Sequence, residues 1–317
     1  MDATGFERLR PKLEGIAYRM TGSVADAQDV AQDAWIRWSS ADRSDVADPE
    51  GYLVRVTTRL SLDRLKAASR RRETYVGPYL PEPVVSQVGD VPDGATSPEE
   101  QAVLADSLTF SFLVMLDELS PVERAVLLLH DVFGYSFDEV AAAVERSTEA
   151  TRQIASRTRR RIAAARPAWG SDVDGVSGSR ESADPVAAGR VEALEIPPAT
   201  LVNLAVALGS GDLEALMDVL APDVVTLTDG GPLQRAARRP VVGRDRVARL
   251  LVWLNQRALD LGLVSQVVQV NGRTGMAMHL PDGTPFLALT GDADDSGRIE
   301  RIYMQLNPDK LAGVPPA

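Results

Sequence analysis

The stretch GYSFDEVAAAVERSTEATRQIASRTRRRI, from Gly134 to Ile162, decides the fold of the middle of this chain. Ser136 followed by Glu139 is a capping box that opens a helix shortly after a glycine, Gly134. The valines and alanines that follow supply a narrow inward face, across which another helix can pack closely. That helix begins after a short turn, where Ser147 or Thr148 can cap it. The stretch therefore predicts two helices joined by a tight turn.

The second of these helices has two chemically different sides. Its inward side is apolar or small, at Ile154, Ala155, Thr158 and Ile162. Its outward side and flanks carry the candidate DNA contacts Thr151, Arg152, Gln153, Ser156, Arg157, Arg159 and Arg160. An outward face of this kind above an apolar stripe is what reading of the DNA major groove requires. The alternative is a structural helical hairpin with a basic exposed face.

Charge is unevenly distributed along the 317 residues. The formal net charge is -11, yet Arg55–Arg72 and Arg146–Arg166 each hold seven basic residues and one acid. Between these two basic islands, Glu73–Glu123 has no lysine or arginine. Neutralisation of phosphate is a local effect that releases counterions, so the islands indicate DNA binding more strongly than the net charge argues against it. Either island alone also fits a solvated helix face.

An acidic face precedes the first basic island. It consists of Asp26, Asp29, Gln32 and Asp33. Their spacing of i, i+3, i+6 and i+7 places them on one side of a predicted helix. Such a face suits docking onto a basic protein surface, and a solvated helix face is the alternative.

Three motifs agree in order and spacing over residues 5–165. They are AYRMTGSVADAQDVAQDAWIRW, DPEGYLVRVTTRLSLDRLKAASRRR and LSPVERAVLLLHDVFGYSFDEVAAAVERSTEATRQ. In these motifs the chain resembles the extracytoplasmic-function (ECF) sigma factors of RNA polymerase. The resemblance implies that the acidic face grips the clamp coiled coil of core RNA polymerase and that the Thr148–Ile162 helix reads the −35 element. Ile154 stands where many members carry a second arginine, which would change base preference.

By the same resemblance, the helix from Tyr52 to Arg72 reads and melts the −10 element. Its basic residues recur at near-helical spacing beside an aromatic residue, which gives phosphate contacts and a support for a flipped base. The candidate −10 contacts are Tyr52, Arg55, Arg59, Arg64 and Lys66.

Composition and resemblance divide the chain into five parts. Residues 1–73 form the sigma region-two domain, 74–105 an acidic Pro/Gly-rich linker, 106–166 the region-four helix-turn-helix domain, 167–196 a flexible linker and 197–312 a further domain. The acids around the first linker resemble the sigma segment that threads a basic channel, and an ordinary solvated linker is the alternative. These acids are Glu73, Glu82, Asp90, Asp93, Glu99, Glu100 and Asp106.

The periodicity changes in the last part of the chain. It predicts helices at about Pro198–Leu208, Asp212–Leu220 and Arg244–Leu259, and strands at about Val224–Thr228, Val264–Val270, Gly275–Leu280, Phe286–Thr290 and Ile299–Leu306. This order resembles the SnoaL-like, cone-shaped α+β domains related to nuclear transport factor two. The predicted fold class is therefore multi-domain, with two all-α sigma domains and a C-terminal α+β domain.

Three short motifs narrow the resemblance to the sigma group that carries such an extension, group forty-one. They are YLPEP (Tyr79–Pro83), DGG (Asp229–Gly231) and NPDKL (Asn307–Leu311), with Tyr79 in place of the usual tryptophan and Pro232 in place of a further glycine. We expect the three motifs to meet in the free protein as a regulatory contact, in which Leu311 covers the stiff apolar segment and Asp309 or Lys310 sets the register. The residues of this contact are Leu80, Pro81, Pro83, Asp229, Gly230, Gly231, Asn307, Asp309, Lys310 and Leu311.

Catalysis by the extension is the alternative to regulation. Domains of this fold include isomerases and cyclases with an Asp or His general base, for which Asp229 and His279 are the candidates here. Asp229 before two glycines is more typical of a turn, and a lone histidine on a strand is more typical of packing. The sequence shows no metal-ligand spacing, phosphate loop or nucleophile triad, so we expect no enzyme, no metal and no cofactor.

The remaining expectations concern partners and compartment. Cysteine is absent, no apolar run approaches the length of a membrane span and the N-terminus does not resemble a signal peptide, which together favour the cytoplasm. The expected partners are core RNA polymerase and promoter DNA, with a small-molecule or protein regulator of the extension and a monomeric free state. Two rival functions are a ligand-sensing helix-turn-helix regulator that acts without polymerase, and a ketosteroid-isomerase-like or cyclase-like enzyme.

Overall fold

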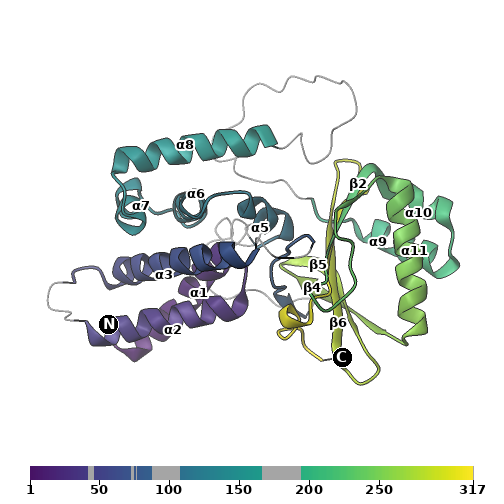
Figure 1. Ribbon diagram of the computed structural model, residues 1–317, viewed down its shortest axis with the longest axis horizontal. Helices are drawn as coiled ribbons and strands as arrows, with labels where there is room; N and C mark the ends of the chain where they lie inside the picture. Colours follow the sequence, from purple (N-terminus) through teal and green to yellow (C-terminus); the bar gives the residue numbers. More distant parts are fainter. Residues whose placement is uncertain (42–45, 73–74, 76, 88–107, 166–193, 317) are drawn as a thin grey trace.

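The computed structural model describes residues 1–41, 46–72, 75, 77–87, 108–165 and 194–316. Two helical domains lie side by side, and a β-sheet with its own helices lies beyond them (Figure 1). This arrangement confirms the predicted class of two all-α domains followed by an α+β domain. Among the described helices, none is long and apolar enough to cross a membrane.

Three helices form the first domain: α1 (Ala3–Thr21), α2 (Val24–Ser40) and α3 (Pro49–Arg72). Gly22 ends α1 in the left-handed conformation, at φ 72°, and the Ser23 side chain then caps α2. These two residues turn the chain back so that α2 packs against α1. The core of the domain includes the fully buried side chains of Leu13, Ile16, Trp38 and Leu53.

The second domain is built from α5 (Phe110–Asp117), α6 (Pro121–Leu127), a π-helical turn η1 (Leu128–Val132), α7 (Phe137–Val144) and α8 (Thr148–Ala165). The predicted capping box of Ser136 and Glu139 opens α7. Glu145 adopts the left-handed conformation at φ 56° and makes the turn, after which the Ser147 hydroxyl accepts from the Ala150 amide. The helix-turn-helix predicted from the sequence is therefore present.

The C-terminal domain contains α9 (Pro198–Ser210), α10 (Leu213–Val219), β2 (Leu220–Asp229), β3 (Val241–Val242), α11 (Arg244–Asp260), β4 (Val264–Val270), β5 (Arg273–His279), β6 (Pro285–Ala293), β7 (Ile299–Gln305) and a 3₁₀ turn η3 (Pro308–Lys310). The predicted helices and strands occur in the predicted order. The short strand β3 and the turn η3 were not predicted. The strand β2 also begins four residues before the predicted start, at Leu220 rather than Val224.

A seven-stranded mixed sheet forms the centre of this domain, in the order β1-β4-β5-β6-β7-β2-β3. One face packs against α9, α10 and α11 through a core that includes Leu216, Val247 and Ile302. The other face turns toward the helical domains, as Figure 1 shows, and is covered by α5, the segment before β1 and the C-terminal tail. Both faces of the sheet are therefore buried, one of them by the rest of the chain.

The edge strand β1 (Val85–Ser86) comes from the stretch predicted to be a linker. It pairs antiparallel with β4, with Val85 opposite Val270. The residues just before it are also ordered on the sheet, and Leu80, Pro81 and Pro83 are buried. The expectation of a linker over 74–105 is wrong for residues 77–87, because alternate apolar side chains there find a sheet edge and an apolar face to cover. Most of the linker acids lie outside the described residues.

Candidate functional site

The outward face of α8 exposes most of the predicted −35 contacts. Arg152, Gln153, Ser156, Arg157 and Arg160 are all exposed. They project from the side opposite the buried residues of the helix, so their donors can reach base edges or phosphates. The Arg152 guanidinium lies 5.6 Å from the centre of the Phe137 ring, which holds it over the start of α7.

Two of the predicted −35 residues do not belong to this exposed face. Thr151 is fully buried and its hydroxyl donates to the Ser147 carbonyl, 3.0 Å away, so its prediction as a DNA contact is wrong. It lies at the first turn of α8, where the inward side faces α7. Arg159 is half-buried and forms a bidentate ion pair with Asp131 of η1. It therefore fixes α8 to the body of its own domain.

The predicted acidic docking face and one predicted −10 residue lie together. The Arg64 guanidinium on α3 is 2.7 Å from Asp26, 3.3 Å from Asp29 and 3.7 Å from Asp33, all on α2. Burial alone would lower the pKa of Arg64, but hydrogen bonds and attraction from Asp26 and Asp29 outweigh it and raise that pKa. The sequence placed these groups in two separate sites. In the structure, three of the four acidic-face residues surround one arginine, and Gln32 stays exposed.

The remaining −10 candidates lie along α3. Tyr52 is half-buried and its ring packs 5.5 Å from that of Trp38. Lys66 is exposed and lies 3.3 Å from Asp63 on its own helix. Arg59 donates to the carbonyl of Ala142, 3.0 Å away, and lies 3.4 Å from the Glu145 carboxylate. Arg59 therefore contacts the helix-turn-helix domain.

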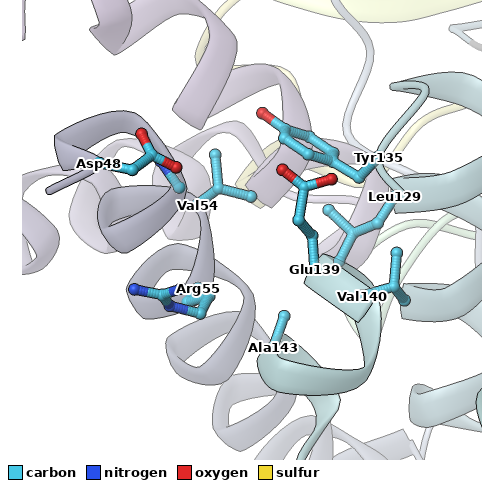
Figure 2. Close-up of a pocket in the computed structure, with 9 residues that line it drawn as sticks. Asp48, Val54, Arg55, Leu129, Tyr135, Glu139, Val140 and Ala143 are labelled. Atoms are coloured by element: carbon cyan, nitrogen blue, oxygen red, sulfur yellow. The ribbon is translucent and has the colours of Figure 1, made fainter. Parts of the chain in front are cut away.

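A seam between α3 and the helix-turn-helix domain was not predicted from the sequence. Figure 2 shows its shallow pocket, which is lined by Val54 and Arg55 from α3 and by Tyr135, Glu139 and Ala143 across from them. Lys12 of α1 adds a further contact, because its ammonium lies 4.9 Å from the Tyr135 ring and 2.7 Å from Glu50. The two helices expected to read DNA thus belong to domains that pack together through these polar contacts and through a shared apolar core.

The three short motifs predicted to form a regulatory contact meet at Asp229. This carboxylate is fully buried at the end of β2 and accepts from the Leu80 amide at 2.9 Å and the Lys310 ammonium at 2.7 Å. The Tyr75 hydroxyl donates to its other oxygen, as does the Gly231 amide at 3.0 Å. We call this cluster of Asp229, Lys310, Tyr75 and Leu80 the Asp229 hub.

The neighbouring motif residues close around the hub. Lys310 also donates to the Leu80 carbonyl at 2.6 Å and lies 3.3 Å from the centre of the Tyr79 ring. Gln305 donates to the Pro81 carbonyl at 3.0 Å, and buried Leu311 covers the same apolar face as Leu80. A Cβ on Gly230 would clash with the Gln234 carbonyl, and a Cβ on Gly231 would clash with the Asn307 side chain. Both glycines are therefore required sterically. Asp309 is exposed and its backbone amide donates to Asn307, so of the two residues expected to set the register it is Lys310 that makes the contact.

The two candidate general bases face no described cavity. The oxygens of Asp229 are occupied by the hub. His279 is fully buried on β5 and its Nε2 lies 2.8 Å from the carbonyl of Pro315, while its Nδ1 has no hydrogen-bond partner in the described part of the chain. It therefore holds the C-terminal tail against the sheet.

The chain matches two protein-family models, Sigma-70 region 2 over residues 6–71 and Sigma-70 region 4 over residues 109–162. The ECF RNA polymerase sigma factor SigJ of Mycobacterium tuberculosis is 37% identical over 321 residues, covering 99% of this chain and 95% of SigJ. The chain belongs to the ECF sigma factors. The probable ECF sigma factor SigI of the same species is 31% identical, over 95% of this chain and 92% of SigI. The crystal structure of SigJ aligns with this structure over 100% of both chains, with a TM-score of 0.71 and 33% sequence identity.

Membership of the ECF sigma factors decides between the functions left open by the sequence. The protein directs transcription initiation, and sigma factors bind core RNA polymerase and promoter DNA. A sigma factor is a non-enzymatic transcription factor, so the enzyme alternative is wrong. The alternative of a regulator acting without polymerase is wrong for the same reason.

Asn271 makes a contact that sequence analysis of this ECF sigma factor missed. It adopts the left-handed conformation, at φ 53°, in the turn between β4 and β5 and is fully buried. Its side chain accepts from the Val84 amide at 3.0 Å and donates to the Tyr18 hydroxyl at 2.7 Å and the Leu108 carbonyl at 2.9 Å. It thus joins α1, the segment before β1 and the start of the second domain. In a sequence, an Asn-Gly pair between two strands indicates only a hairpin turn.

Two carboxylates take part in further contacts between domains. Glu82, predicted to belong to an acidic linker, is buried and accepts from the Val24 amide at 2.8 Å, which caps α2. Asp292 of β6 accepts from the Ser111 hydroxyl of α5, next to Phe110, whose ring stacks 5.6 Å from Tyr303. Burial raises the pKa of Asp292, against the opposing effect of the Ser111 hydrogen bond. No sequence pattern distinguishes these acids from solvated ones.

Proposed function

We propose that this ECF sigma factor is held closed by its C-terminal domain, and that promoter recognition requires it to open. Core polymerase docks on Asp26, Asp29, Gln32 and Asp33. The −10 element is read by Tyr52, Arg55, Arg59, Arg64 and Lys66, and the −35 element by Arg152, Gln153, Ser156, Arg157 and Arg160. The free chain is a monomer, and it works in the cytoplasm with the polymerase that it serves. The observation that carries the proposal is the meeting of the three motifs at the Asp229 hub.

The hub supports a closed state because the buried charges of Asp229 and Lys310 neutralise each other. Asp229 has no exposed side-chain area and Lys310 has 12%. Removal of one partner from a buried ion pair leaves an uncompensated charge, which typically costs about 3–5 kcal/mol. The three motifs come from distant parts of the chain, so this cost ties the segment that follows α3 to the C-terminal domain.

The seam supports the requirement for opening. The Nη2 group of Arg59 already donates to the Ala142 carbonyl, so it cannot donate to a DNA phosphate at the same time. Packing of α3 against α7 also holds the two reading helices at one fixed separation. Binding of both promoter elements is therefore favoured when the seam is broken. A small-molecule or protein regulator of the C-terminal domain would act by shifting this equilibrium, for which a difference of a few kcal/mol is enough.

Transcription in vitro tests the closed state. In Lys310→Met the aliphatic stem remains but the charge on Asp229 is unpaired, so we expect severalfold more transcript from a cognate promoter with reconstituted core polymerase. Asp309→Ala is the matched control, because Asp309 is exposed in the same motif. Unchanged transcript from Lys310→Met, with the hub shown to be open by hydrogen exchange of residues 77–87, would contradict the proposal.

The −35 assignment has its own test. Arg152→Ala removes an exposed guanidinium from the reading face of α8, and we expect promoter binding by the holoenzyme to weaken by about 1–3 kcal/mol, the usual discrimination of a bidentate base contact. A footprinting titration measures the change. Thr151→Ser serves as the control, since the hydroxyl of Thr151 is buried. Equal protection of the −35 region by Arg152→Ala and the wild type would remove α8 as the reading element.

A further inference from the structure

The C-terminal domain carries a third basic island that the sequence analysis did not single out. Between Gly230 and Leu259 the chain has seven arginines and one acid, Asp245. The island spans the loop between β2 and β3, the strand β3 and the helix α11. Its arginines are Arg235, Arg238, Arg239, Arg244, Arg246, Arg249 and Arg257. The numbers of basic and acidic residues equal those of the two basic islands in the sigma domains, over a longer stretch, in a protein whose net charge is -11.

The arginines of α11 share one outward stripe. Arg246, Arg249, Trp253 and Arg257 are all exposed, at the spacing i, i+3, i+7 and i+11. The opposite side of the helix is buried in the core of the domain. Figure 1 shows α11 on the side of the sheet away from the helical domains, so the stripe faces outward. It extends for about 16 Å along the helix.

Most of these side chains have no acidic partner. Within the described part of the chain, Arg235, Arg238, Arg239 and Arg257 form no ion pair or hydrogen bond. Only Arg249 is paired, at 3.0 Å from Asp245. By contrast, Arg64 and Arg159 in the helical domains are neutralised by carboxylates. An unpaired set of guanidinium groups is suited to bidentate recognition of phosphate oxygens.

An exposed tryptophan marks the same stripe. Trp253 is 62% exposed, which is unusual for this side chain in a monomeric surface, and no arginine of the described residues stacks on its ring. Tryptophan between arginines supplies apolar contact area beside charge-assisted hydrogen bonds, a combination suited to the sugars and phosphates of a nucleic-acid backbone.

The loop part of the island lies next to the DNA-reading half of the molecule. A Cβ on Gly77, which is in the left-handed region at φ 91°, would lie 3.5 Å from Cα of Arg238 and 3.6 Å from the Ala237 carbonyl. Gly77 follows α3, the helix assigned to the −10 element, by a few residues. The basic loop therefore lies in space beside the segment that follows the helix assigned to the −10 element.

We propose that Arg235, Arg238 and Arg239 of the β2–β3 loop, together with Arg246, Arg249, Trp253 and Arg257 of α11, form an additional binding surface for the backbone of duplex promoter DNA. The surface binds phosphates without reading sequence. A duplex presents one phosphate per 3.4 Å of each strand, so a stripe about 16 Å long can contact several of them. The C-terminal domain then contributes to affinity when the promoter is bound.

Salt dependence of holoenzyme binding to a promoter duplex tests this surface. Two triple variants remove its parts, Arg235→Ala/Arg238→Ala/Arg239→Ala and Arg246→Ala/Arg249→Ala/Arg257→Ala. Every phosphate that is no longer neutralised reduces the slope of log K against log salt by about 0.9, so the slope should be smaller by about 2 or more in each variant. At low salt the affinity should fall tenfold or more, equally on the cognate promoter and on a duplex of scrambled sequence. Arg298→Ala, an exposed arginine in the turn between β6 and β7, is the matched control.

Charge-preserving variants separate binding from folding. Arg→Lys at the same positions should keep the slope, whereas a folding defect would not be rescued by charge. A wild-type slope in both alanine variants overturns the proposal, and so does loss of core-polymerase association with an unchanged slope, which would assign the surface to a protein partner. The preference of the wild type for the cognate promoter over the scrambled duplex is measured in the same assay. Loss of that preference would contradict the −35 assignment, whereas an unchanged salt slope in the variants would contradict the additional surface.

Discussion

The seam between α3 and α7 joins the two helical domains, whereas the interface on the sheet face joins both of them to the C-terminal domain, and the two differ in chemistry. At the seam, Arg59 and Glu145 have 46% and 68% of their side chains exposed. At the sheet face, Asp229 and Asn271 have none exposed. An exposed ion pair contributes about 0–1 kcal/mol, whereas a broken buried network leaves groups without hydrogen bonds and costs several times more. The fully buried carboxylate and amide described above therefore lie at the interface of the C-terminal domain, while the two helical domains also share an apolar core.

This difference implies an order of opening. The polar contacts of the seam can exchange with water, whereas its apolar part, a core shared by the two helical domains, separates only after the C-terminal domain has released the segment before β1. The reverse order is unfavourable, because an open seam leaves the Asp229 hub intact. Variants at the two interfaces should consequently differ in magnitude, and the three below are given from the largest expected effect to the smallest.

The largest effect is expected from Asp229→Ala. It leaves Lys310 almost fully buried without its carboxylate and removes the acceptor for Leu80 and Tyr75. We expect the free energy of unfolding of the full chain to fall by about 3–5 kcal/mol in urea titration. Asp309→Ala, an exposed residue next to Lys310, should change it by less than about 0.5 kcal/mol. If the two variants are equally stable, the hub does not hold the domains together.

An intermediate effect is expected from Asn271→Gly. Glycine keeps the left-handed turn and removes the three side-chain hydrogen bonds, so the decrease of about 2–3 kcal/mol reports those hydrogen bonds alone. Asn271→Ala should be less stable still, because alanine at φ 53° is strained. Hydrogen exchange of Val84 is a direct measurement, since its amide donates to Asn271. Slow exchange of that amide in Asn271→Gly would show that the contact is dispensable.

The smallest effect is expected from Arg59→Ala at the seam. It removes one exposed ion pair and one hydrogen bond to Ala142, and the free energy of unfolding should change by less than about 1 kcal/mol. Arg8→Ala, an exposed arginine of α1, is the control. If Arg59→Ala lowered the free energy of unfolding as much as Asp229→Ala does, the two interfaces would not differ in stability as argued above.

Local patterns made most of the fold predictable. Capping residues such as Ser136 and Glu139 fix where helices begin, and the alternation within β4 to β7 fixes strands, so both are visible in a short window of sequence. The same holds for the exposed face of α8. The burial of Thr151 was missed because a threonine at the start of a helix is compatible with either side.

Contacts between distant residues were predictable only where motifs resembled those of a known group. YLPEP, DGG and NPDKL were expected to meet on that ground, and Asp229, Leu80 and Lys310 are in contact. The pairing of Arg64 with the acidic face, the cap formed by Glu82 and the bridge formed by Asn271 leave no periodic signal. Each depends on tertiary packing, which decides whether a polar side chain meets water or another segment.

The two-residue strand β1 has a geometrical consequence for the span of the molecule. It fixes the chain between α3 and α5 to the sheet, so Phe110 is connected to that anchor by a tether of at most ~85 Å. Without the anchor, the tether runs from Arg72 to Phe110 and reaches up to ~130 Å. A longer tether also lowers the effective concentration of one DNA-reading domain near the other. Release of two backbone pairings thus sets how far apart on a promoter the two domains can bind.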